Sequence, residues 1–359
     1  MVEGPEFAFQ LAPVSDVETS DADLYAAALE DARLGYELGY SAVWMIEHHF
    51  TDYYPTPNPL IMLSQIAAIC PGLGLGTCVM VLPWYNPLRF AEDVAMLQML
   101  SGAPLHIGIG RGTAKLEYDA FGIDMTEARD RFRESWEIVE EALKGAPFTY
   151  TGEHFSVNSP LRLRPELNGR KPNFYGAIGS PQSAEIMADL GLPPLALAQF
   201  PDHILRSIVE NWDRRSVEHG RSANVTKPIL IQCYVADTDE EARAEAKRYL
   251  PLYFQRQVEH YEVLKNPWKD IAGYEQFSRF FANLLDLSDP AKIDKFLDMN
   301  AIGSPETVTR RLQHLNGIGF NHFVMTTATP GVPAEVRHRN MRRFASEVMP
   351  KFKITSAAA

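Results

Sequence analysis

The feature that most constrains the fold is a regular alternation of short apolar runs with segments of helical length. Amphipathic stretches lie between the runs, at 24–38, 87–100, 127–143, 181–190, 203–219 and 305–315. The apolar runs begin at residues 7, 42, 74, 105, 173, 195, 229 and 322. Several are apolar on both alternating sets of residues, as strands of a parallel sheet covered by helices must be. Eight such units without a duplicated half favour a closed (β/α)8 barrel, an α/β fold, over an open doubly wound sheet.

Two segments fall outside this repeat. Residues 147–157 alternate around Thr151-Gly152 and predict a small β-hairpin before the fifth strand. Residues from about 250 to 300 are aromatic-rich and longer than one crossover needs, which predicts a helical insertion before the last βα unit. The insertion either has a small core of its own or forms a lid over the barrel mouth. Because no low-complexity linker interrupts the chain, we expect a single domain over residues 1–359.

Composition and charge narrow the classes of partner. The net charge of −12 disfavours nucleic acid and anionic membranes, because both attract basic surfaces. No apolar run approaches the roughly 20 residues that span a bilayer, and no secretory signal begins the chain, so we expect a cytoplasmic protein. The three cysteines form no CxxC pair and suggest neither disulfides nor a zinc knuckle. Small molecules and other proteins are the expected partners.

The stretch SAVWMIEHHF, residues 41–50, ends an apolar run in three titratable groups. The carboxyl ends of barrel strands carry the chemistry, so Glu47, His48 and His49 are candidate active-site residues. In an extended segment, Glu47 and His49 would share one direction and His48 would take the other. The histidines could instead simply hydrogen-bond backbone carbonyls. The remaining histidines show no HExxH-type spacing, so we predict no metal, although ligands can converge from distant positions.

Two further clusters suggest an anion site. In LHIGIGRG, residues 105–112, glycines alternate in a pattern that differs from the GxGxxG turn and that would let a flat ligand approach the backbone. Arg111 follows there, and Arg129 begins a later helix; each could meet an anion or form an ordinary surface ion pair.

The second cluster is GSPQSAE, residues 179–185. Ser180 is suited as an N-cap before Pro181, and the free amides of such a helix start bind phosphate. The similar stretch GSPETV, residues 303–308, carries Glu306 in its first turn, which would repel an anion. We therefore favour the helix start at Ser180 as the phosphate site.

These residues and their spacing resemble the bacterial luciferase-like flavin monooxygenase family, whose members are (β/α)8 barrels. The resemblance is carried by EHHFT at 47–51, NP at 58–59, GTCVMVLP at 76–83, NPLRFAEDV at 86–94, GIGRG at 108–112 and FGIDMTEARDRF at 121–132. A weaker match at 303–325 extends it over most of the chain.

The resemblance implies a set of site residues. His48 matches the family's catalytic histidine, with Glu47 and His49 beside it at the flavin. A non-proline cis peptide would fall at Cys78-Val79, and Arg111, Arg129, Ser180 and Ser183 would bind the phosphate of flavin mononucleotide (FMN). Trp84 and Tyr85 replace smaller or polar residues, which suggests a pocket for a bulky apolar or aromatic substrate. The full set of implied cofactor contacts is Cys78, Val79, Gly110, Arg111, Arg129, Ala177, Gly179, Ser180 and Ser183.

The resemblance also implies an activity. Reduced FMN would react with O2 to give a C4a-peroxyflavin, which passes one oxygen atom to an organic substrate. Since no segment resembles a nicotinamide-binding reductase, a separate flavin reductase would supply the reduced FMN. Family analogy suggests a homodimer. Two alternatives remain at this point: an oxidoreductase dependent on coenzyme F420 on the same fold, and a non-catalytic flavin-binding partner subunit.

Overall fold

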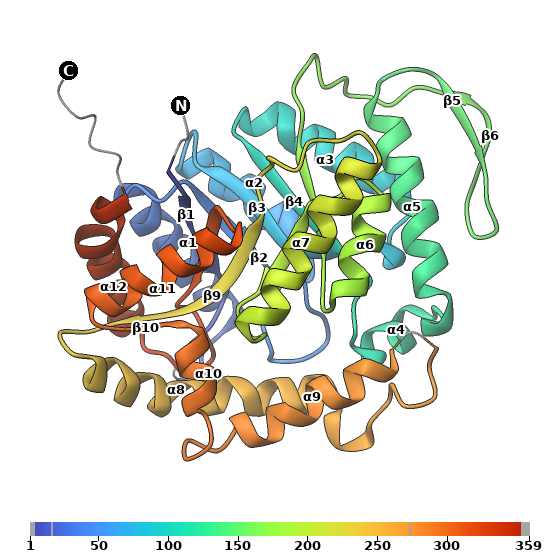
Figure 1. The fold of residues 1–359 in the computed structure, drawn as a ribbon. Coiled ribbons are helices and arrows are strands. Elements are labelled where there is room, and N and C mark those ends of the chain that lie inside the picture. Colours follow the sequence, from blue (N-terminus) through green and yellow to red (C-terminus); the bar gives the residue numbers. More distant parts are fainter. Residues whose placement is uncertain (1–3, 16, 273, 353–359) are drawn as a thin grey trace. The chain divides into compact units, whose positions relative to one another are not determined.

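The computed structural model describes residues 4–15, 17–272 and 274–352 (Figure 1). All eight predicted strands are present, and the sheet order is β10-β9-β11-β1-β2-β3-β4-β7-β8. Because β8 also pairs with β9, eight strands close into the predicted (β/α)8 barrel. The barrel strands are β1 Glu6–Leu11, β2 Ala42–Met45, β3 Gly74–Val81, β4 Leu105–Gly110, β7 Asn173–Ala177, β8 Pro194–Leu197, β9 Pro228–Val235 and β11 His322–Thr326.

Helices follow the strands, and the six amphipathic stretches all form helices. The main helices are α1 Asp21–Glu37, α2 Pro59–Ile69, α3 Pro87–Ser101, α4 Lys115–Phe121, α5 Ala128–Leu143, α6 Pro181–Asp189, α7 Asp202–Glu218, α8 Asp239–His260, α9 Glu275–Leu287, α10 Asp294–Met299, α11 Pro305–Ile318 and α12 Ala334–Arg343. Short 3-10 or π segments are Leu82–Trp84, Met125–Glu127, Val263–Lys265, Phe344–Val348 and Met349–Phe352. None of the helices among the described residues is long and apolar enough to cross a membrane.

Several elements were not named in the sequence prediction, among them helices α2, α4 and α12 and strand β10. Helix α2, PLIMLSQIAAI, is apolar at most positions, so it shows little of the periodicity that marks a helix packed on one face. Strand β10, Ala301–Gly303, is only three residues long and pairs in parallel with β9. Strands this short leave no readable alternation in the sequence.

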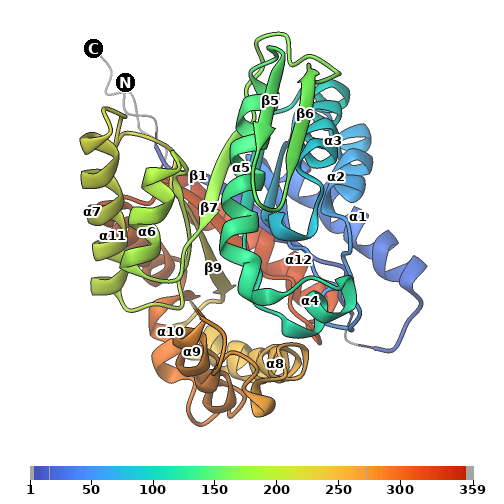
Figure 2. The same ribbon diagram turned by 90° about the vertical axis from the view of Figure 1, so that its right-hand side faces the viewer.

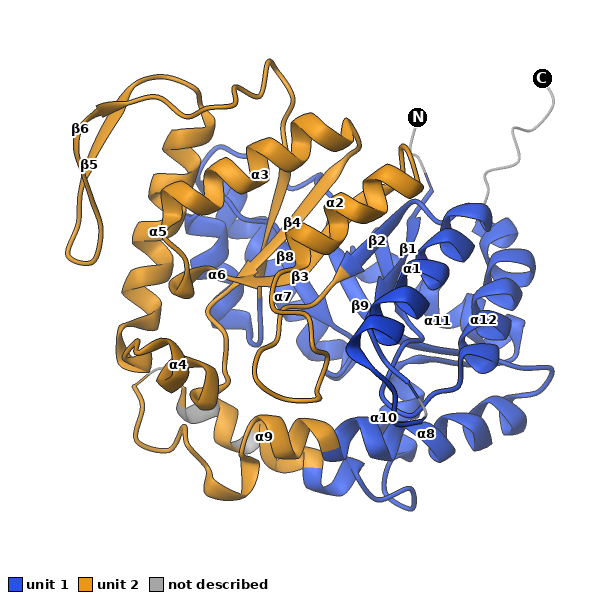
Figure 3. Ribbon diagram, turned by 180° about the vertical axis from the view of Figure 1, so that it is seen from behind, with its two compact units in different colours: residues 1–44, 178–255, 285–359 blue, residues 45–177, 256–284 orange. Residues whose placement is uncertain are grey.

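Residue contacts divide the chain into two compact units (Figure 3). One contains residues 1–44, 178–255 and 285–359, and the other contains residues 45–177 and 256–284. The second unit, which we call the β3–β4 unit, includes the predicted hairpin, formed by β5 Phe148–Thr151 and β6 Ser156–Leu161 beside α5 (Figure 2). Most of the candidate site also belongs to the β3–β4 unit.

The aromatic segment between about 250 and 300 is helical, as predicted. Within the β3–β4 unit, the Phe281 ring stacks on Trp268 with centroids 4.4 Å apart and lies 4.5 Å from the ring of Tyr261. The indole Nε1 of Trp268 donates a hydrogen bond to the backbone carbonyl of Thr113, at 2.7 Å, just after β4. This segment therefore has an aromatic core of its own, and its function as a lid stays a prediction.

Candidate functional site

The residues after β2 point in alternate directions, as the sequence predicts. Glu47 is 2% exposed, and one carboxylate oxygen, Oε2, accepts the backbone N–H of Val81 at 2.6 Å. The other, Oε1, accepts the hydroxyl of Tyr85 and lies 3.1 Å from His49 Nε2. Glu47 and His49 thus share one direction. Because three donors occupy the Glu47 carboxylate, its evident task is to hold these groups in place.

Burial dominates the electrostatics around Glu47. It raises the pKa of the carboxyl group, and the hydrogen bonds from His49, Tyr85 and the Val81 amide oppose that rise. Burial and the neighbouring Glu47 carboxylate also raise the pKa of Tyr85, which therefore stays a hydrogen-bond donor at neutral pH.

His48 turns the other way, into a buried cluster with Glu117 and His260. These three side chains belong to residues that are 6%, 2% and 1% exposed. Glu117 Oε1 lies 3.5 Å from His48 Nδ1 and 3.5 Å from His260 Nε2. The backbone N–H of His49 donates to the same Glu117 oxygen at 2.7 Å, and Thr51 Oγ1 lies 2.7 Å from His260 Nδ1. We call His48, Glu117 and His260 the buried triad.

The triad contains neutral imidazoles. Burial lowers the pKa of both His48 and His260 to about 3 and raises the pKa of Glu117. Glu117 and His260 were not among the residues predicted from the sequence. No local pattern identifies them, because Glu117 lies in the short helix α4 and His260 ends the long helix α8. Two imidazole nitrogens and a carboxylate oxygen are also ligand types that bind zinc.

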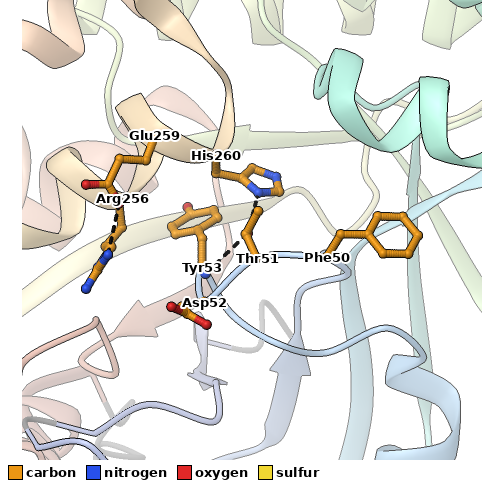
Figure 4. A pocket seen from close by; sticks show the side chains of 7 residues that line it. All are labelled: Phe50, Thr51, Asp52, Tyr53, Arg256, Glu259 and His260. Carbon is orange, nitrogen blue, oxygen red and sulfur yellow. Dashed lines mark hydrogen bonds and ion pairs between the residues drawn. The ribbon is translucent and has the colours of Figure 1, made fainter.

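A cavity of about 270 Å³ opens beside the triad in the β3–β4 unit (Figure 4). Its lining comes from two segments far apart in the sequence: Phe50, Thr51, Asp52 and Tyr53 after β2, and Arg256, Glu259 and His260 at the end of α8. Figure 4 shows the hydrogen bond between Thr51 and His260 that joins the two segments. His260 is therefore the residue that the cavity and the triad share.

The predicted substrate residues Trp84 and Tyr85 have different surroundings. Trp84 is half-buried, and its ring lies 5.4 Å from His49 and 5.3 Å from Phe121, centroid to centroid. Its Nε1 has no hydrogen-bond partner among the described residues. The hydroxyl of Tyr85 is instead engaged by Glu47. Trp84 thus presents aromatic surface next to His49, whereas Tyr85 supports the Glu47 network.

The predicted flavin contacts on β3, β4 and β7 lie close together. The peptide bond Cys78-Val79 is cis, as the family resemblance implies. A Cβ atom built on Gly110 would lie 2.8 Å from Val79 Cγ2 and 3.3 Å from Ala177 Cβ. Glycine at this position therefore allows the side chains of Val79 and Ala177 to meet beside the backbone of β4.

Arg111 and Arg129 both act on Tyr274. The Arg111 guanidinium carbon lies 4.8 Å from the centre of the Tyr274 ring. Burial raises the pKa of Tyr274, and the charges of Arg111 and Arg129 lower it. Among the side chains that the structure describes, neither arginine forms an ion pair, whereas Arg133 on the same helix as Arg129 pairs with Asp130 and Glu137. The two predicted anion-binding cations differ in burial, since Arg111 is half-buried and Arg129 is exposed.

The helix start at Ser180 has the predicted capping residues. The Ser180 hydroxyl oxygen accepts the backbone N–H of Ser183 at 3.1 Å, and the Ser183 hydroxyl oxygen accepts the N–H groups of Ser180 and Gly179 at 3.0 and 3.2 Å. No acidic residue lies in the first turn of α6. Two small hydroxyls thus cap this end without placing a negative charge there.

The similar start of α11 is already neutralised within the chain. The Asp239 carboxylate accepts the backbone N–H of Ser304 at 2.7 Å and the hydroxyl of Thr307 at 2.9 Å. These hydrogen bonds, led by that of Ser304, lower the pKa of Asp239. The start of α11 thus carries a carboxylate and the start of α6 carries none, and the phosphate site at Ser180 stays a prediction.

Comparison with known proteins assigns the family. The sequence profile of the family described as luciferase-like monooxygenase matches residues 6–322. The chain belongs to the luciferase-like monooxygenase family. This membership makes it an oxidoreductase enzyme, in agreement with the resemblance stated from the sequence blocks.

One curated relative and two solved structures are similar to this chain. The oxygenase component of flavin-dependent trigonelline monooxygenase from Acinetobacter baylyi is 26% identical over 353 residues, with 94% of this chain and 92% of the relative covered. The oxygenating constituent of 3,6-diketocamphane monooxygenase from Pseudomonas putida, solved in complex with FMN, is 20% identical to this chain. The alignment covers 97% of this chain and 99% of that one, with a TM-score of 0.77. An F420-dependent secondary alcohol dehydrogenase is 15% identical, and the alignment covers 98% of this chain and 99% of that one, with a TM-score of 0.73. The two solved structures show that this luciferase-like chain has the same fold.

Proposed function

We propose that this chain is the oxygenase component of a two-component flavin-dependent monooxygenase. It would take reduced FMN from a separate reductase and use O2 to insert one oxygen atom into an apolar or aromatic organic substrate. Relatives named as an oxygenase component and as an FMN-bound monooxygenase support this proposal. The proposal covers substrate class and cofactor, which family membership leaves open.

The observation that carries the proposal is a pair of arginines, Arg111 and Arg129, that form no ion pair among the described side chains and both act on Tyr274. Arg111 is half-buried, where a cation normally finds a carboxylate, and Arg129 is exposed. A phosphate monoester supplies the missing charge and accepts paired N–H donors. This supports Arg111 and Arg129 as phosphate ligands, and the family resemblance implies Gly179, Ser180 and Ser183 as further phosphate contacts.

The other site residues would handle the flavin ring and the substrate. Reduced flavin supplies the oxygen chemistry, so the protein must bind, orient and exclude water. Cys78, Val79, Gly110 and Ala177 would form the surface against which the ring lies. His48, neutral because it is buried, would contribute an imidazole hydrogen bond, and Glu47 and His49 would hold the segment that carries it. Trp84 would offer an apolar face to the substrate.

Binding of reduced FMN tests the proposal most directly. Anaerobic ultrafiltration with reduced FMN should show binding to the wild type and weaker binding to Arg111→Met and Arg129→Met. Loss of one charge-assisted hydrogen bond costs about 1.5–3 kcal/mol, which corresponds to roughly 10- to 150-fold in Kd. Arg133→Met is the matched control, because Arg133 lies on the same helix but is already ion-paired. Equal losses in all three variants would refute the assignment.

Isotope labelling then tests the reaction. Wild-type protein supplied with reduced FMN, 18O2 and a library of aromatic and apolar compounds should give a product that contains a single 18O atom. The same experiment with reduced F420 and no oxygen tests hydride transfer instead. Tight binding of F420 without binding of FMN would replace the monooxygenase assignment by the F420-dependent one.

A further inference from the structure

The buried triad has an unusual hydrogen-bonding state. His48 Nδ1, His48 Nε2 and His260 Nε2 are buried and make no hydrogen bond among the described residues. Buried polar nitrogens nearly always have a partner, since an unpaired one costs about 1–3 kcal/mol. Here Nδ1 of His48 and Nε2 of His260 both lie 3.5 Å from Glu117 Oε1 without the geometry of a hydrogen bond. One nitrogen of each histidine therefore lies close to the same carboxylate oxygen without a hydrogen bond to it.

We propose that His48 Nδ1, Glu117 Oε1 and His260 Nε2 form a binding site for one divalent transition-metal ion, with Zn²⁺ the expected occupant. The three atoms lie within 4.8 Å of one another. With zinc bonds of about 2.0–2.1 Å, the edge between two ligands of a tetrahedral site is roughly 3.4 Å. The two distances from Glu117 Oε1 to the histidine nitrogens, both 3.5 Å, match that edge, and the third edge, between the two nitrogens, is at most 4.8 Å.

The surrounding contacts orient the three ligands. Thr51 Oγ1 lies 2.7 Å from His260 Nδ1 and can accept a hydrogen bond from the N–H group at Nδ1. The lone pair of His260 then lies on Nε2, on the side of Glu117. The N–H of His49 donates to the ligating oxygen of Glu117 at 2.7 Å and fixes the carboxylate. Outer contacts of this kind are a regular feature of protein metal sites.

An ion also needs a route to the triad and a charge balance. The cavity in Figure 4 reaches His260 and is lined by the exposed residues Asp52 and Glu259, of which Glu259 pairs with Arg256 at 2.9 Å. Two neutral imidazoles and one carboxylate leave a net charge of +1 on a bound Zn²⁺. Two His and one Glu with a fourth position open is a ligand set found in zinc enzymes.

Zinc at Nδ1 would fix the tautomer of His48. The remaining proton must then reside on Nε2, which has no partner among the described residues and stays available as a donor. The inference is thus compatible with the proposed function of His48 but does not rest on it, because the metal ligands are read from the triad alone.

Metal analysis of the full chain tests this inference. After dialysis against EDTA and then micromolar ZnCl2, the wild type should retain stoichiometric zinc by mass spectrometry, and CoCl2 should give the visible absorbance of four-coordinate Co²⁺. Glu117→Gln and His260→Gln should lose both signals. His154→Gln is the matched control, since the His154 ring pairs with Glu127, outside the triad.

A milder variant protects the test against misfolding. Thr51→Val keeps the side-chain shape, removes the hydroxyl beside His260, and should weaken zinc affinity about 10- to 100-fold. If the wild type retains no stoichiometric zinc, as expected if water fills the triad, the inference is overturned. It is also overturned if Glu117→Gln retains as much zinc as the wild type. Binding of reduced FMN is measured separately, so an FMN-binding chain without zinc refutes this inference and leaves the proposed function standing.

Discussion

Replacement of Glu47 offers a direct test of what organises the segment after β2. In Glu47→Ala, the N–H of Val81, the hydroxyl of Tyr85 and the ring of His49 all lose their acceptor. Each buried donor left unpaired costs about 1–3 kcal/mol, and removal of an unfavourably buried carboxylate offsets part of the sum. We therefore expect the free energy of unfolding to fall by about 2–4 kcal/mol. In Glu47→Gln, the amide oxygen can keep the Val81 hydrogen bond while Tyr85 rotates its hydroxyl to accept from the new NH2 group. We expect this variant to lose no more than about 1 kcal/mol.

Two measurements separate these outcomes. Urea unfolding followed by tryptophan fluorescence gives the change in free energy at constant m-value. Hydrogen–deuterium exchange of the peptide that contains Val81 reports the local effect. If exchange occurs through opening of this segment, a loss of about 2 kcal/mol in the free energy of opening makes exchange roughly 30-fold faster. If the alanine variant matches the wild type in both measurements, the network does not organise this segment. Equal destabilisation by alanine and glutamine would mean that the charge matters and not the set of acceptor positions.

Two further predictions concern stability in the β3–β4 unit. Burial raises the pKa of Glu134, but hydrogen bonds from three successive backbone N–H groups at 153–155 outweigh that effect and leave it below its ordinary value. The stabilisation is therefore present at neutral pH and is lost as pH falls through the folded-state pKa. Glu134→Gln should lower the free energy of unfolding by about 1–2 kcal/mol at pH 7 and by progressively less in acid. A difference in melting temperature between variant and wild type that does not change with pH would contradict this. Gly112 has φ of +71°, and an added Cβ would lie 2.6 Å from a valine methyl, whereas Gly122 has φ of +67° and open space around it. Gly112→Ala should therefore lower the melting temperature more than Gly122→Ala, and equal shifts would show that only backbone strain matters.

The local features of this chain could be predicted from its residues. The alternation of apolar runs with amphipathic stretches predicted the eight barrel strands, because hydrophobic patterns are set by residues close together along the chain. Side-chain direction in an extended segment depends only on position along it. The same rule placed Glu47 and His49 on one side and His48 on the other. Capping residues such as Ser180 act within one turn of their own helix, so they too can be read directly.

Contacts between distant segments required the structure. His260 and Thr51 are 209 positions apart, and nothing near either residue indicates that they meet. Similarly, the sequence shows the two GSP helix starts but not that Asp239 caps the second one, and it does not tell whether Arg111 and Arg129 have ion-pair partners.

The sequence by itself thus determined the strands, most helices and the identity of the residues at the strand ends, since hydrophobic periodicity and capping are short-range. Only the tertiary structure decided which titratable side chains share a buried space, and so joined Glu117 and His260 to His48. The physical reason is that closure of the sheet brings together residues whose interaction energies depend on burial and distance, and neither quantity is encoded in the spacing along the chain.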